Sequence, residues 1–111
     1  MPIKYIKTVS FGSISADSTS KQTYTFEEGG TLKYILVNER SGASLNALLV
    51  TLTLSGDTLT RDVVPASILG EDMRTAFPIE KAVRKGDKLD ISIYNGGSSA
   101  VNVDVCVIIE E

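Results

Sequence analysis

With 111 residues, the chain has the length of one domain, and its composition (42% hydrophobic, 23% charged) is that of a globular protein with a core of its own. A single cysteine excludes an intramolecular disulfide framework, and the absence of histidine removes Ser-His-Asp and Cys-His catalysis and the usual zinc and copper sites. We therefore expect one domain over 1–111, which is not an enzyme and has no metal or other cofactor.

Nucleic acid and membranes are not predicted partners. The formal net charge is −3, and the one dense basic stretch, 81–88, contains four cations around Asp87 without interleaved aromatic residues. We interpret it as a charged turn rather than a phosphate-binding patch. The N-terminal segment 1–13 has no apolar stretch of signal-peptide length, and no run reaches the roughly 18 apolar residues that span a bilayer.

In the first half of the chain, apolar residues recur with the period of two that is typical of β-strands. Strands are predicted over 3–11, 22–26, 31–39 and 46–55, separated by polar or glycine-containing turns. The last of these alternates most regularly, and its predicted inward residues are Leu48, Val50, Leu52 and Leu54.

The strand predicted over 31–39 is apolar on both faces. Leu32, Tyr34 and Leu36 lie on one face of an ideal strand, and Ile35 and Val37 lie on the other. We therefore expect both sides of this strand to be covered.

The second half continues with a turn at 56–57 and a hairpin partner over 58–64. The segment 65–76 breaks the alternation and is predicted as a loop with one helical turn near Pro65, which crosses between sheets. Extended structure resumes over 77–83, where Pro78 favours an edge strand.

The closing segment predicts a hairpin of two strands around the turn 95–100. Its predicted inward residues alternate regularly along both strands: Leu89, Ile91, Ile93, Val101, Val103, Val105 and Val107.

About eight short strands with frequent turns and no convincing helix predict an all-β fold, a two-sheet antiparallel sandwich. The longer crossing in the second half favours a jelly roll. An immunoglobulin-like sandwich is the second choice, because the chain contains no tryptophan and lacks the Cys…Trp…Cys pattern of such domains.

Carboxylates are the remaining candidates for chemistry. Asp57 and Asp62 flank one turn, Asp87 and Asp90 flank another, and an acidic pair occupies 71–72. A glycosidase needs two carboxylates beside a sugar cleft, for which so short a domain has little room. No EF-hand pattern supports calcium, so we interpret these residues as solvated turn aspartates rather than as ligands.

Several strands carry apolar residues on their nominally outward faces, which requires a second covering layer. A neighbouring subunit is the favoured cover, and a loop folded over one sheet is the alternative. Tyr94 is outward beside the turn at 95–97 and is interpreted as an interface residue rather than a sugar-stacking platform. The candidate interface residues are Ile6, Ile35, Val37, Leu49, Tyr94, Cys106 and Ile108.

The second half also carries a family resemblance. It contains Phe77-Pro78-Ile79, then Gly86-Asp87 before the alternating Leu89 and Ile91, the turn Asn95-Gly96-Gly97, and the valine-rich strand 101–107. This order resembles the closing strands of small jelly-roll virion proteins, namely minor capsid, decoration and spike subunits of tailed phages and archaeal viruses. The resemblance implies a structural subunit that forms trimers, pentamers or a lattice, and it implies no catalytic or ligand-binding residues.

The leading hypothesis is therefore a non-catalytic virion subunit, made in the host cytoplasm, whose partners are copies of itself or other shell proteins. The alternative is a carbohydrate-binding β-sandwich module with a glycan as its partner. A cytoplasmic adaptor within a larger assembly is the third hypothesis.

Overall fold

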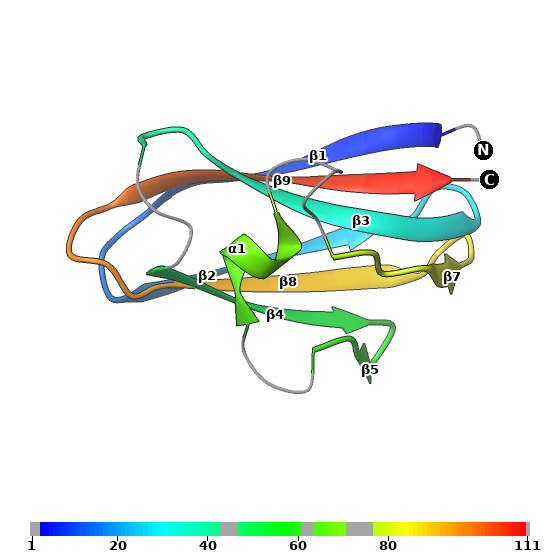
Figure 1. The fold of residues 1–111 in the computed structure, drawn as a ribbon. Helices are drawn as coiled ribbons and strands as arrows, with labels where there is room; N and C mark the ends of the chain where they lie inside the picture. Colours follow the sequence, from blue (N-terminus) through cyan, green and yellow to red (C-terminus); the bar gives the residue numbers. More distant parts are fainter. Residues whose placement is uncertain (1–2, 43–46, 61–63, 71–76, 111) are drawn as a thin grey trace.

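The structure is a computed structural model of the chain, and it describes residues 3–42, 47–60, 64–70 and 77–110. Strands dominate these ranges, and a single helical turn interrupts them (Figure 1). The elements in chain order are β1 (Ile3–Ile14), β2 (Ser18–Thr25), β3 (Gly30–Glu39), β4 (Leu48–Leu54), β5 (Asp57–Thr58), β6 (Val64–Pro65), α1 (Ala66–Leu69), β7 (Lys81–Val83), β8 (Lys88–Asn95) and β9 (Val101–Glu110).

Two antiparallel sheets stack into a sandwich. Sheet A has the strand order β1-β9-β3-β7, and sheet B has the order β2-β8-β4-β5, with β6 also paired to β4. The pairings are nested along the chain, because β1 pairs with β9, β2 with β8, β3 with β7, and β4 with β5 and β6. This nesting is the jelly-roll topology, so the predicted fold class is confirmed.

The core lies between the sheets and contains the predicted inward residues of the most regular strands. The three leucines and one valine on the inward face of β4 are at most 4% exposed, and the alternating residues of β8 and β9 are buried in the same way. A hairpin follows β4 as predicted, but Leu54 pairs with Asp57, so the turn lies one residue earlier than predicted and the partner strand β5 has only two residues. Both turn residues, Ser55 and Gly56, have positive φ, which matches the twist of a tight hairpin.

The prediction for the two faces of β3 was wrong. The pairing of β3 with β9 shifts register between Leu32 and Tyr34, which is a β-bulge around Lys33. An extra residue reverses the alternation, so Leu32, Ile35 and Val37 all point into the core and are at most 1% exposed. Ile35 and Val37 are therefore core residues and not members of an interface.

The closing segment is not a hairpin, although both of its strands form. Strand β8 belongs to sheet B and β9 to sheet A, so the turn between them crosses from one sheet to the other (Figure 1). The buried side chain of Asn95 holds this crossing together. Its Nδ2 donates to the carbonyls of Ile14 (3.1 Å) and Ser99 (2.9 Å), and its Oδ1 accepts from the amide of Gly97 (3.0 Å).

The single helical turn occurs where it was predicted. It begins directly after Pro65 and ends at Gly70, whose φ of 86° lies in the left-handed region that favours glycine. The carbonyl of Gly70 accepts from the amide of Val37 (3.0 Å), so the turn is fastened to the edge of β3. The remainder of the predicted loop, 71–76, lies outside the described residues.

Candidate functional site

The residues predicted as an interface do not form one surface. The structure distributes them among three places: Ile35 and Val37 in the core, Ile6, Cys106 and Ile108 on the outer face of sheet A, and Leu49 and Tyr94 on the outer face of sheet B. The two outer faces are therefore distinct surfaces.

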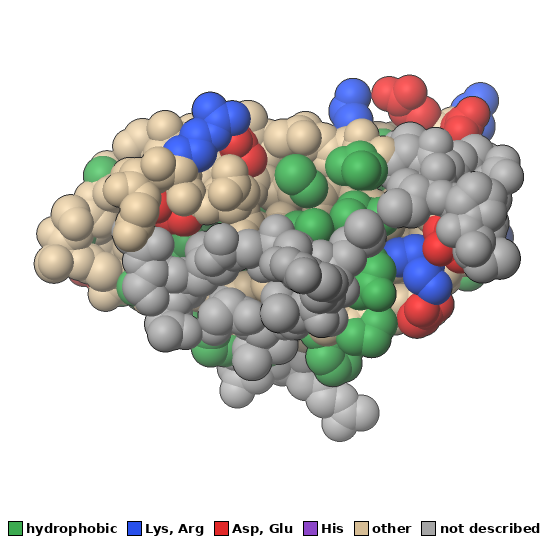
Figure 2. Space-filling view, turned by 45° about the horizontal axis from the view of Figure 1, so that its top comes forward, with side chains coloured by type: hydrophobic (Ala, Val, Ile, Leu, Met, Phe, Trp, Pro, Cys, Tyr) green, Lys and Arg blue, Asp and Glu red, His purple; other side chains and the backbone are tan. Residues whose placement is uncertain are grey.

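The outer face of sheet A is apolar over its middle. Strand pairing places side chains of β1, β9 and β3 in two adjacent rows, Ile6–Ile108–Tyr34 and Thr8–Cys106–Leu36. We call the surface formed by Ile6, Tyr34, Leu36, Cys106 and Ile108 the apolar face. Figure 2 shows hydrophobic side chains gathered on this upper side of the molecule, between charged side chains at both ends.

Members of the apolar face differ in exposure. Ile6 is 57% exposed, whereas Ile108, in the central strand, is only 2% exposed. Ile108 was predicted as an interface residue. It lies between Ile6 and Tyr34 and is almost fully buried, so little of its side chain is available to a partner. Cys106 is half-buried, and its Sγ lies 3.8 Å from the hydroxyl oxygen of Thr8.

Ion pairs bound the apolar face. At one end, Arg40 pairs with the carboxylate of Asp104, whose side chain is 6% exposed against 61% for Arg40. Burial of an unpaired carboxylate is costly, and the ion pair with Arg40 offsets the cost of burying the Asp104 carboxylate. Near the β3 bulge, Lys33 Nζ lies 2.5 Å from Glu80 Oε1, and this hydrogen bond raises the pKa of Lys33 above its ordinary value.

The outer face of sheet B is polar and hollowed. A groove of about 420 Å³ crosses β2, β8 and β4, and we call it the polar groove. Within it, Thr23 donates a hydrogen bond of 2.6 Å to Asp90. Its lining is rich in hydroxyl groups and contains one ammonium and one carboxylate: Lys21, Gln22, Thr23, Thr51, Thr53, Asp90, Ile91 and Ser92.

The other two predicted interface residues lie beyond one end of the polar groove. Tyr94 pairs with Leu49, which also pairs with Pro65, so a small half-buried apolar cluster forms on this face. The Tyr94 hydroxyl donates to the carboxylate of Asp17, and this hydrogen bond raises the pKa of Tyr94 above its ordinary value. A hydroxyl held in this way fits a structural role for the ring.

We expect the phenol of Tyr94 to titrate above pH 10, because ionisation breaks its hydrogen bond to a carboxylate and creates a like-charge contact. The measurement is phenolate absorbance against pH, taken as the difference between the parent protein and Tyr94→Phe. Since the folded-state pKa lies above the unfolded one, the contribution of this contact to stability is present below pH 10 and is lost as pH rises through the folded-state pKa. Asp17→Asn is the control and should lower the midpoint; an unchanged midpoint contradicts the assigned cause.

The predicted turn aspartates act as local acceptors. Asp87 accepts from the Arg84 amide (2.9 Å) and from the Ser55 hydroxyl (3.2 Å), which closes the basic turn. Among the described residues, no group of three or more Asp, Glu, His or Cys side chains could hold a metal ion. Asp62 and the acidic pair at 71–72 lie outside those residues.

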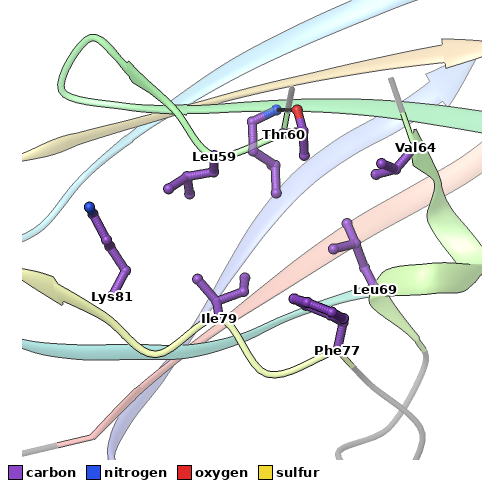
Figure 3. Close-up of a pocket in the computed structure, with 8 residues that line it drawn as sticks. Leu59, Thr60, Val64, Leu69, Phe77, Ile79 and Lys81 are labelled. Atoms are coloured by element: carbon purple, nitrogen blue, oxygen red, sulfur yellow. Dashed lines mark hydrogen bonds between the residues drawn. The ribbon is translucent and has the colours of Figure 1, made fainter. Parts of the chain in front are cut away.

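Sequence reasoning missed one feature, an apolar pocket of about 350 Å³ at the open side of the sandwich (Figure 3). Its lining comes from β4, the segments around β5, β6 and α1, and the approach to β7. Of the residues that line the pocket, the alternation pattern predicted Leu52 as inward, but nothing local connects these segments to one another.

No helix in the described part of the chain is long and apolar enough to cross a membrane. No protein-family model matches the chain, and no curated protein matches it. Among solved structures, it is similar to an exo-beta-1,3-galactanase from Phanerochaete chrysosporium, crystallised with galactose, with a TM-score of 0.45 and 14% identity. The match covers 96% of this chain and 30% of the galactanase, so the chain spans less than a third of that protein.

Proposed function

We propose that this chain is a non-catalytic structural subunit of a virion (capsid, decoration or spike) that assembles with copies of itself or with other shell proteins. The jelly roll is a recurrent architecture of viral capsid domains, although lectin domains use it too. The observation that carries the proposal is the apolar face, which leaves Ile6 exposed beside a half-buried tyrosine, leucine and cysteine. Exposed apolar patches of this kind mark interaction surfaces.

Assembly through this face is favoured over pairing through the neighbouring sheet edge. Among the described residues, β1 pairs only with β9, and its register is irregular near Tyr5 and again near Gly12. Lys7 of the edge strand β1 is exposed and pairs with the core residue Val107. A charged residue therefore occupies an inward-facing position of the edge strand. Bulges and inward charges are features that discourage edge-to-edge pairing, so the face is the better contact.

We expect Ile6→Asp to convert an oligomer into a folded monomer. Assembly removes the Ile6 side chain from water, whereas a carboxylate at this position resists burial. Light scattering gives the mass, and the reaction rate of the single thiol, Cys106, with a small disulfide reagent reports whether the face is covered. The thiol should react more slowly in the assembled parent than in Ile6→Asp.

Thr51→Asp is the matched control, because Thr51 lies in the polar groove on the opposite face. It should leave both the mass and the thiol reactivity of the parent unchanged. A parent protein that is monomeric at micromolar concentration overturns the proposal.

A carbohydrate-binding module is the second candidate, and the polar groove favours it. Hydroxyl, ammonium and carboxylate groups within one hollow are suited to hydrogen-bond the hydroxyls of a sugar. None of the residues that line the groove is aromatic, and Tyr94, beyond its end, is engaged with Asp17. A glycan array read with the parent and with Asp90→Asn tests this candidate: binding that is lost in the variant supports it, and the absence of any signal argues against it.

A further inference from the structure

The apolar pocket exists because the strands on one side of the sandwich are short. Strand β7 pairs with β3 at only three positions, Gly30 to Leu32, and β5 and β6 each pair with β4 at two positions. Among the described residues, neither sheet is therefore closed by a full-length strand on this side, and a cavity remains between the sheets. We call this cavity the edge pocket (Figure 3).

The floor and walls of the edge pocket are almost entirely apolar. Leu52 and Leu69 are at most 4% exposed, whereas Phe77 is 59% exposed. The side chains that line the pocket from different segments point toward a common centre in Figure 3. The Thr60 hydroxyl oxygen accepts from the amide of Leu52 (3.2 Å), so that acceptor is engaged with the protein.

The described lining has a cation, Lys81, at one end. Lys81 occupies the same side of β7 as the buried Val83, and its side chain borders the pocket near Leu59 (Figure 3). Its neighbour Glu80 is engaged by Lys33, and among the described residues no ion pair involves Lys81. Among its described lining residues, the site therefore combines an apolar cavity with one ammonium group at one end.

We propose that the edge pocket binds a single-chain aliphatic carboxylate, a medium-chain fatty acid, with its alkyl chain inside the cavity and its carboxylate at Lys81. The volume of about 350 Å³ lies at the lower end of the range for small-molecule sites, which suits one narrow chain. The apolar lining favours an alkyl group, and the Lys81 ammonium matches one negative charge. The proposal is independent of the proposed function, because the pocket shares no residue with the apolar face.

Titration of the full chain with octanoate, decanoate and dodecanoate, each below its micelle concentration, tests the chain-length dependence. Methyl resonances of Leu52, Leu59 and Ile79 should shift and saturate at one ligand per chain. The affinity should rise about fourfold for each added methylene, the gain expected when a methylene leaves water. Shifts that do not saturate, or that spread over the whole surface, overturn the proposal, as does the absence of binding.

Lys81→Met tests the charge. Decanoate should bind this variant about tenfold more weakly, the effect of losing one charge-assisted hydrogen bond, whereas decanol should bind both proteins equally. Lys85→Met, in the adjacent basic turn, is the matched control and should bind decanoate as the parent does. Equal decanoate binding by the parent and Lys81→Met overturns the assignment of the carboxylate to this end of the pocket.

Discussion

Replacement of Ile35 by alanine is expected to lower the free energy of unfolding by about 2–5 kcal/mol, and replacement by aspartate is expected to prevent folding. Ile35 is 1% exposed and lies opposite Val107 on the inner face of sheet A. Alanine leaves a cavity among closely packed neighbours, and aspartate places a carboxylate where no partner is available. Since small domains have total stabilities of about 5–15 kcal/mol, either change is a large fraction of the whole. Urea unfolding followed by circular dichroism measures both effects.

Ile6→Asp is the control for this experiment, because Ile6 belongs to the same sheet but is 57% exposed. The stability of its monomer should remain within about 0.5 kcal/mol of that of the parent monomer, measured at concentrations where the parent is dissociated. If instead Ile35→Asp folds normally and changes only the oligomeric state, Ile35 faces outward and the assignment of this residue to the core is wrong.

Asn95→Ala is expected to cost about 2–4 kcal/mol, because it removes three hydrogen bonds from a fully buried position. The carbonyls of Ile14 and Ser99 and the amide of Gly97 lose their side-chain partner at the point where the chain passes from sheet B to sheet A. The measurement is again the free energy of unfolding, with the midpoint and slope of the urea transition both determined.

Ser98→Ala, in the same turn but exposed, is the matched control and should change stability by less than about 0.5 kcal/mol. Equal effects of the two substitutions would show that the Asn95 network contributes little. Loss of stability in Asn95→Ala alone would show that this residue, and not the turn in general, stabilises the crossing.

The alternation of apolar and polar residues was sufficient to predict most of the strands. On β4, β8 and β9 it also identified the inward side chains correctly, since the orientation of successive residues in a regular strand depends only on the local backbone. The same rule failed on β3. The bulge there depends on pairing with β9, whose residues lie about seventy positions further along the chain, and no local pattern records it.

Connectivity between strands was predicted less well than the strands themselves. The closing segment has the same alternating pattern whether its two strands pair with each other or lie in opposite sheets. The difference depends on the turn at Asn95, which binds a carbonyl of β1, and on the neighbours of β8 and β9 in their separate sheets. The pattern was therefore compatible with a hairpin that does not form.

The candidate interface and the edge pocket were predicted least well from the sequence. Ile6 and Cys106 were identified correctly as outward residues, but Ile35 and Val37 were assigned to the same interface although they lie in the core. The edge pocket was missed because its lining comes from segments that have no common period.

The sequence by itself determined that the protein is an all-β sandwich and which side chains of its regular strands are buried, because strand periodicity is a local property. Only the tertiary structure decided which strands are neighbours, where β3 changes face, and that an apolar face, a polar groove and an edge pocket exist. These features arise from contacts between residues far apart in the chain, which the order of residues along a single strand does not contain.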